Sequence, residues 1–214
     1  MNTDDLIDML ATGAAPVGRH AGARRFGVAL PLAALGSLLL MAVVFGVRPD
    51  LASVAHTAPF WEKLAFASVV MLGALVAVSR LARPGARVGA AGGWLLALPV
   101  AFVWIGGAAL VALAAPEDRV TLLLGHTWRT CPFNILLLSV PGFVAVFRAV
   151  RGLAPTRLRA AGAASGLLAG AIATFAYSFH CPEMSPAFWG IWYVLGMLLA
   201  SAFGAVIGPR LLRW

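Results

Sequence analysis

The sequence predicts an all-α protein: a polytopic membrane bundle of six transmembrane helices with both termini in the cytoplasm. Of its 214 residues, 61% are hydrophobic and only 11% are charged, whereas a soluble domain carries roughly a quarter charged residues. Uncharged stretches recur along the chain, each near the roughly 20 residues that a helix needs to cross a bilayer. The basic residues between these stretches gather on one side of the predicted membrane, which is typical of a multi-pass protein.

The uncharged stretches define six expected spans, at about 27–47, 64–79, 89–115, 133–147, 160–180 and 187–208. We expect the second span to extend back to Phe60. The fourth span is short and contains Pro141, so it is expected to start near Trp128 or to be kinked, because proline removes a hydrogen bond inside a helix. Lipid cannot satisfy an open backbone, and the runs lack the alternation of barrel strands, so helices are expected throughout. The chain then divides into a cytoplasmic tail, 1–26, and a six-helix transmembrane domain, 27–214.

The distribution of basic residues predicts the orientation. Twelve of the sixteen lie on the side of the two termini: Arg19, Arg24, Arg25, Arg80, Arg83, Arg87, Arg148, Arg151, Arg157, Arg159, Arg210 and Arg213. The other side holds Arg48, Lys63, Arg119 and Arg129. Because Lys and Arg are retained in cytoplasmic loops, this asymmetry requires an even number of spans with both ends inside. The net charge of +8 is thereby explained by lipid head groups, and no direct nucleic-acid binding is expected.

The expected span interiors contain no ionisable side chain, which argues against a proton or ion carrier. They do contain small residues spaced by four: Gly162, Gly166, Gly170 and Thr174 in the fifth span, and Gly196, Ala200, Gly204 and Gly208 in the sixth. Such ridges allow close backbone approach in lipid, so the fifth and sixth spans are predicted to pack on each other. Aromatic residues near the outer span ends are interpreted as head-group anchors: Trp61, Trp128, Tyr177, Trp189, Trp192 and Tyr193.

The only two cysteines occur in matching contexts, Thr130-Cys131-Pro132 and His180-Cys181-Pro182. Cys131 opens the fourth span and Cys181 closes the fifth, and the short connection between these spans makes them antiparallel neighbours. At about 1.5 Å per residue, the two sulfurs lie within roughly 5 Å of the same height. A disulfide is feasible if the side chains face each other. It is interpreted either as a structural staple in an oxidising compartment or as a bond that responds to its surroundings.

A metal site is a third interpretation of the cysteines. His126, Cys131, His180 and Cys181 form a chemically sensible set for a transiently bound heavy-metal ion, although their spacing matches no established zinc motif. No resident cofactor is expected. Enzymatic thiol exchange is disfavoured because there is no Cys-x-x-Cys. A thiol–quinone oxidoreductase and a small-molecule channel are kept as alternative functions.

The N-terminal tail is predicted to form a short amphipathic helix. Thr3 can cap it, Asp4 and Asp5 suit its positive end, and Gly13 can terminate it. The predicted partner-binding residues are Thr3, Asp4, Asp5, Leu6, Ile7, Asp8 and Leu10. An acidic helix is repelled by anionic lipid, so a protein groove with a basic rim is the expected partner. The alternative is a frayed tail without a partner.

These features together resemble the NrsF-like family of bacterial membrane anti-sigma factors: the Thr3-to-Ile7 segment, six spans, and the outer motifs around Cys131 and Cys181. The resemblance covers essentially the whole chain. It implies a multi-pass protein of the bacterial inner membrane whose tail binds an extracytoplasmic-function sigma factor. It also implies that Cys131 and Cys181 respond to oxidative or metal stress, and that the protein is not an enzyme.

Overall fold

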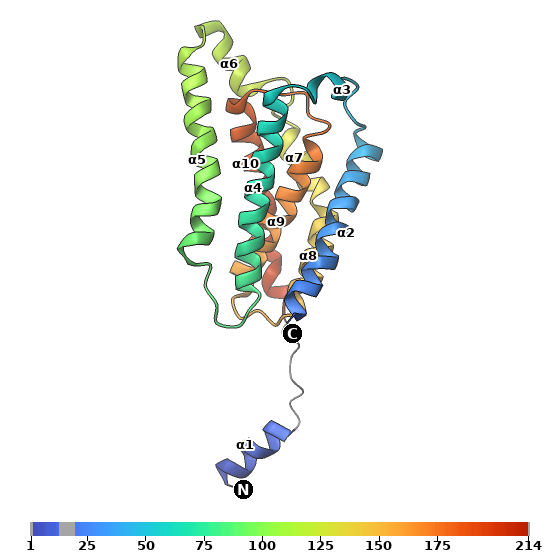
Figure 1. The fold of residues 1–214 in the computed structure, drawn as a ribbon, viewed down its shortest axis with the longest axis vertical. Coiled ribbons are helices and arrows are strands. Elements are labelled where there is room, and N and C mark those ends of the chain that lie inside the picture. Colours follow the sequence, from blue (N-terminus) through green and yellow to red (C-terminus); the bar gives the residue numbers. More distant parts are fainter. Residues whose placement is uncertain (1, 13–19, 214) are drawn as a thin grey trace.

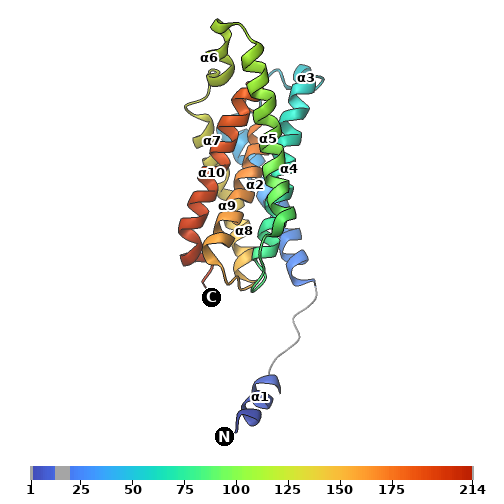
Figure 2. The same ribbon diagram turned by 90° about the vertical axis from the view of Figure 1, so that its left-hand side faces the viewer.

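A computed structural model of the chain describes residues 2–12 and 20–213, and the described part consists of helices and connections without strands. Figure 1 shows an elongated helical bundle, and Figure 2 shows the same bundle from the side. The helices are α1 (Thr3–Thr12), α2 (Ala21–Val44), α3 (Leu51–Val54), α4 (Ala58–Leu81), α5 (Gly89–Leu113), α6 (Pro116–Leu124), α7 (Cys131–Leu138), α8 (Val140–Arg151), α9 (Leu158–Tyr177) and α10 (Pro186–Leu211).

Five helices are long and apolar enough to cross a membrane: α2, α4, α5, α9 and α10. The consecutive helices α7 and α8 are apolar and bent by 45° at their junction, and they bring the number of spans to six when the pair is counted as one broken span. The predicted all-α membrane bundle is therefore confirmed. The second span starts earlier than expected, at Ala58 rather than residue 64 or Phe60. Pro59 lies in its first turn, where a missing N–H costs nothing.

The fourth span is broken at Ser139, two residues before Pro141, so the kink expected from this proline is present. Proline cannot donate to the carbonyl four residues earlier, so the helix is interrupted here. The Ser37 hydroxyl of α2 donates to the Leu138 carbonyl at 2.9 Å. Pro141 packs against Gly36, where an added Cβ would lie 2.7 Å from the proline ring. The break is thus held against α2.

Helix α9 lies at the centre of the bundle and packs most extensively on α10. A Cβ at Gly170 would lie 2.9 Å from the Ala200 Cβ, and one at Gly208 would lie 2.6 Å from the Leu158 carbonyl oxygen. The predicted glycine packing of the fifth and sixth spans is confirmed. Gly196 is an exception, because it faces Ile135 of α7 instead.

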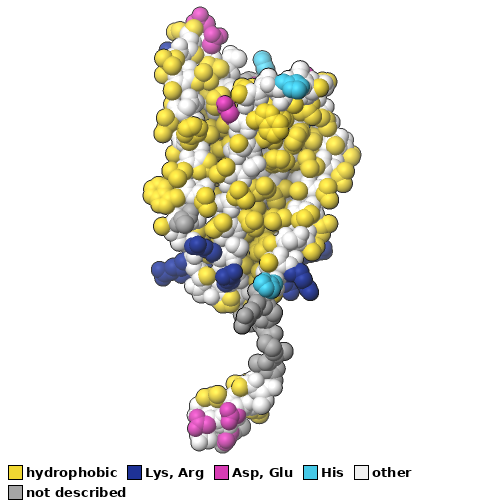
Figure 3. Space-filling view, viewed as in Figure 1, with side chains coloured by type: hydrophobic (Ala, Val, Ile, Leu, Met, Phe, Trp, Pro, Cys, Tyr) yellow, Lys and Arg dark blue, Asp and Glu magenta, His cyan; other side chains and the backbone are white. Residues whose placement is uncertain are grey.

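The charges separate along the long axis of the bundle. Figure 3 shows Lys and Arg side chains gathered at the end where α2 begins, and acidic side chains at the opposite end and on α1. This separation follows from the positions of the arginines at the span ends. It matches the uneven distribution on which the predicted orientation rests.

Helix α1 precedes the bundle and buries none of its residues. Its N-terminal cap is Asn2 rather than the expected Thr3: the Asn2 side chain accepts from the Thr3 N–H at 2.8 Å, and the Asn2 N–H donates to Asp5 at 3.2 Å. Asn2 precedes the first helical residue, which is where a capping side chain must lie. The helix ends at Thr12, and the expected terminator Gly13 lies outside the described residues.

Candidate functional site

The two cysteines lie next to each other at the end of the bundle where α7 and α10 begin and α9 ends. Cys131 is the first residue of α7, and Cys181 lies in the connection between α9 and α10. Both are fully buried free thiols, and each influences the ionisation of the other. The structure therefore brings together the two predicted sensor residues.

Two cations converge on the connection that carries Cys181. The Lys63 ammonium donates to the Cys181 carbonyl at 3.0 Å and to the Glu183 carbonyl at 3.2 Å. Arg48 donates to the same Cys181 carbonyl at 3.1 Å. The Lys63 Nζ also lies 6.0 Å from the centre of the Tyr193 ring, a distance at which a cation is attracted to the ring face.

Lys63 corrects the expectation that the span interiors contain no ionisable residue. It lies inside α4 and is 0% exposed. The sequence places Lys63 with the outer basic residues at the edge of the second span, whereas the structure turns it into the bundle. A buried ammonium is costly unless its donors find acceptors, and here main-chain carbonyls accept. Within the described residues it has no carboxylate partner, since the ion pair found there joins Arg48 to Asp50.

Arg48, in contrast, has its charge compensated. Its Nε and Nη2 donate to the two carboxylate oxygens of Asp50 at 2.7 and 2.8 Å. These hydrogen bonds lower the pKa of Asp50 and raise the pKa of Arg48. The bidentate pair fixes Arg48 beside the cysteine connection. Lys63 is therefore the cation at this site whose charge an anionic sulfur can balance.

The environment favours ionisation of Cys181. A hydrogen bond from Cys131 lowers the pKa of the Cys181 thiol, and the nearby Lys63 ammonium lowers this pKa further, against the opposing effect of burial. The thiolate is the form of cysteine that attacks oxidants and binds metals. The site thus holds one readily ionised thiol, Cys181, and a second thiol, Cys131, next to it.

Aromatic residues enclose the cysteines. Tyr177, Trp189 and Tyr193 are between 0 and 3% exposed, so their predicted role as head-group anchors is wrong. Trp189 and Tyr193 are four residues apart on α10 and therefore share the face turned inward. The Asn134 amide donates to the Tyr177 hydroxyl at 3.3 Å. Neither the Tyr193 hydroxyl nor the Trp189 indole N–H has a hydrogen-bond partner among the described residues.

The connection after α6 covers the site. Glu183 accepts from the His126 main-chain N–H at 2.7 Å, and the Thr127 hydroxyl lies 4.0 Å from the Cys181 sulfur. Gly125 has a φ of +53°, and a Cβ there would lie 2.6 Å from the Glu183 carboxylate. Only glycine readily adopts this backbone conformation while leaving room for the carboxylate. Water is thereby kept from the thiols.

The structure does not assemble the four-residue metal set considered above. The Nδ1 of His180 lies 2.9 Å from the Gly46 carbonyl, and its ring packs against Phe45 and Tyr177. His126 contributes only its main-chain N–H to this region. No three His, Cys, Asp or Glu side chains are grouped to hold a metal within the described ranges. The hydrogen bond of His180 turns it toward α2 rather than toward the sulfurs.

Sequence reasoning missed Lys63, Arg48 and Tyr193 as members of the site. One signal was available: Lys63 is the only lysine among sixteen basic residues. Lysine and arginine are interchangeable near head groups but not where a compact ammonium must fit inside a protein. Tyr193 had no such signal, because tyrosines near span ends are ordinarily anchors.

Comparison with known proteins covers the whole chain. The family described as "NrsF: Negative regulator of sigma F" matches residues 10–214. The "Probable anti-sigma-F factor NrsF" of Azospira oryzae is 45% identical over 217 residues, with 100% of both chains covered. The "Anti-sigma-F factor NrsF" of Caulobacter vibrioides is 36% identical over 216 residues, again with 100% of both covered. No solved structure matches.

Proposed function

This chain belongs to the NrsF family of negative regulators of sigma F, and from that premise we propose that it is a membrane-bound anti-sigma factor. It sequesters an extracytoplasmic-function sigma factor through its N-terminal segment, 1–26, in the cytoplasm. It releases this partner when Cys131 and Cys181 meet oxidative or metal stress on the other side of the bacterial inner membrane. The role is regulatory rather than catalytic.

The observation that carries this proposal is the position of α2. At its far end, the Arg48 N–H donates to the Phe179 carbonyl at 3.1 Å, and His180 pairs with Gly46 at 2.9 Å. These contacts attach α2 to the connection that holds Cys181. At its other end, α2 continues into the segment that carries α1. A change at the thiols can therefore reach α1 through one helix, provided that the signal favours one of two conformations.

Helix α7 supplies a second contact with α2. Cys131 opens α7, and the break between α7 and α8 is held to α2 by Ser37 and Pro141. A broken helix can change its bend with less loss of hydrogen bonding than a continuous one. Movement of Cys131 is thus expected to alter the angle at Ser139 and the packing of α2.

Hydrogen peroxide accepts two electrons from the Cys181 thiolate and the Cys131 thiol, the sulfurs form one disulfide, and water and hydroxide leave; the hydroxide takes up a proton from solvent to become a second water. Alternatively, a soft divalent metal ion binds both sulfurs as thiolates, and the Cys131 thiol releases one proton. Both reactions draw the two sulfurs into a new geometry and remove the thiolate that balances Lys63.

The proposed partner surface is the apolar side of α1. Leu6, Ile7, Met9 and Leu10 are exposed, and Leu10 is 66% exposed. Asp4, Asp5 and Asp8 flank this side. A short helix with few internal contacts is marginal alone and is stabilised by docking into a groove.

Recovery of the sigma factor with the tagged full chain from solubilised membranes tests this surface. Leu10→Gln is expected to reduce recovery at least tenfold, because a buried leucine contributes about 2 kcal/mol. The matched change Ala11→Gln, next to the acidic side of α1, should leave recovery near that of the unchanged chain. Equal recovery with both variants would reject α1 as the binding segment.

The cysteines are tested separately through reporter transcription under peroxide or cadmium stress. The double variant Cys131→Ser, Cys181→Ser is expected to sequester the sigma factor normally and to lose induction. Induction that persists unchanged in this variant would reject the sensor role while leaving the anti-sigma role intact.

A further inference from the structure

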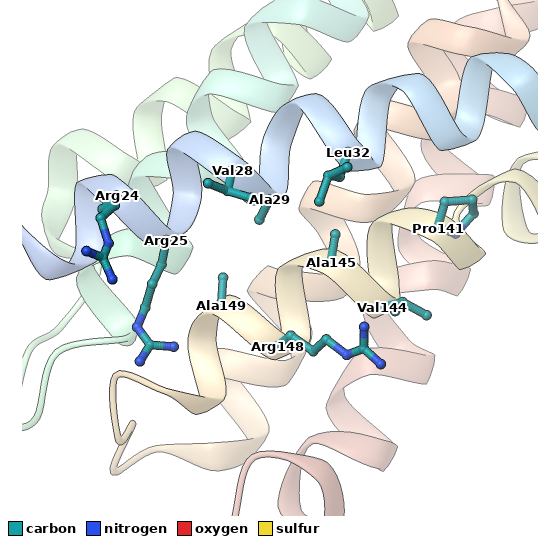
Figure 4. A pocket seen from close by; sticks show the side chains of 10 residues that line it. All are labelled: Arg24, Arg25, Val28, Ala29, Leu32, Pro141, Val144, Ala145, Arg148 and Ala149. Atoms are coloured by element: carbon teal, nitrogen blue, oxygen red, sulfur yellow. The ribbon is translucent and has the colours of Figure 1, made fainter.

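A groove between α2 and α8 opens on the side of the bundle near the arginine-rich end. Its volume is about 700 Å³. Figure 4 shows Arg24 and Arg25 at one end of the groove and Pro141 toward the other end. The Arg148 side chain extends from α8 toward Val144, away from Arg24 and Arg25. The lining is otherwise apolar: Val28, Ala29, Leu32, Val144, Ala145 and Ala149. The groove combines a cationic end with an apolar channel.

The three guanidinium groups have no anionic partner in the structure. Among the described residues, neither an ion pair nor a side-chain hydrogen bond involves Arg24, Arg25 or Arg148. The Arg25 guanidinium lies against Gly152, where any side chain would displace it. The chain has no acidic residue near this end of the bundle except those of α1. Three uncompensated cations along one groove favour an anionic ligand.

The apolar wall indicates what the anion is attached to. Val28 and Leu32 are each 59% exposed and lie in a helix long enough to cross the membrane, so hydrocarbon covers them. A second groove of about 290 Å³ lies on the other side of α8 and shares Val144 and Arg148 with the first. Two apolar channels that meet at one arginine suit a head group carrying two acyl chains.

We propose that this groove binds an anionic phospholipid, with its head group between Arg24 and Arg25 at one end and Arg148 on α8, and its acyl chains along α8. Basic pockets between transmembrane helices recognise such head groups. A protein segment is a poorer fit, because the groove lies within the apolar belt, where only hydrocarbon is abundant. The lipid would join α2 to α8 at the end of α2 from which the chain leads to α1.

Native mass spectrometry of the full chain, with phosphatidylglycerol and phosphatidylcholine of identical acyl chains, tests the proposal. The unchanged protein should retain phosphatidylglycerol selectively. The triple variant Arg24→Gln, Arg25→Gln, Arg148→Gln should lose about hundredfold in this affinity, or about fivefold per arginine. Its thermal unfolding midpoint should remain, since all three side chains are exposed.

Matched variants separate the groove from its alternatives. A control removes the same charge at the same end but outside the groove: Arg83→Gln, Arg87→Gln, Arg159→Gln. It should change affinity less than about threefold, whereas Val144→Trp should weaken lipid binding without any change in charge. Equal losses in the two triple variants would overturn the proposal, because bulk charge would then explain the selectivity.

Two further outcomes would also overturn it. Displacement of the lipid by millimolar inorganic phosphate would show a free-anion site rather than a lipid site. Lipid retention that appears only after Asp4→Asn, Asp5→Asn, Asp8→Asn would show that α1 occupies the groove.

Discussion

Replacement of Lys63 by methionine tests the electrostatics of the cysteine site. Methionine has a similar length and no charge, so Lys63→Met removes the buried ammonium with little change in volume. An adjacent opposite charge lowers a thiol pKa by about one to three units. Arg48 donates to the Cys181 carbonyl and stays beside the thiol after the change. Because one cation remains, we expect an effect at the lower end of this range. The pKa of Cys181 should rise by about one unit, which leaves about tenfold less thiolate at a pH below the pKa.

The ultraviolet absorbance of the thiolate, followed against pH in detergent, measures this change. The same titration of the double variant Cys131→Ser, Cys181→Ser provides the background from tyrosine. Arg129→Met is the matched control, because it removes an exposed cation at the same end of the bundle. The ionisation midpoint of the thiol in this variant should stay within about 0.3 pH unit of the unchanged protein, since exposed charges are screened. A midpoint that is unchanged in a folded Lys63→Met protein would refute the reasoning.

Three further predictions concern packing and pH. Gly166→Leu should destabilise the bundle by more than about 3 kcal/mol, because the added side chain meets the α10 backbone, whereas Ala202→Leu, exposed on α10, should leave the thermal midpoint unchanged. Ser37→Ala should cost about 1 kcal/mol in the same assay by leaving the Leu138 carbonyl without its donor. The pKa of the Cys181 thiol is lowered in the folded protein, so its thiolate stabilises the fold. This contribution is complete above pH 9.0, the ordinary pKa of a thiol, and it is lost as the pH falls through the lowered pKa. The thermal midpoint should therefore fall with decreasing pH in the unchanged protein, and this part of the fall should be absent in Cys181→Ser.

Much of the site was predictable because its defining residues have local signals. Cys131 and Cys181 are the only cysteines, each precedes a proline, and span order places them at one end of two neighbouring helices. The residues that tune them were not predictable in the same way. The sequence places Lys63 at the outer edge of the second span and Tyr193 at the head groups, whereas the structure buries both inside the bundle. Both errors concern which way a side chain faces.

The sequence by itself determined the membrane class, the approximate spans, the kink near Pro141 and the glycine packing of α9 on α10. These follow from local properties. A segment must be apolar over the thickness of the bilayer to span it, and helices pack closely in lipid where small residues face each other. Only the tertiary structure decided which face of each helix turns inward, and so which polar groups surround the thiols. When a span is apolar on all sides, its sequence has no amphipathic pattern from which the buried face can be predicted. The position of α2, in contact with the cysteine connection at one end and leading to α1 at the other, became visible only when the helices were packed together.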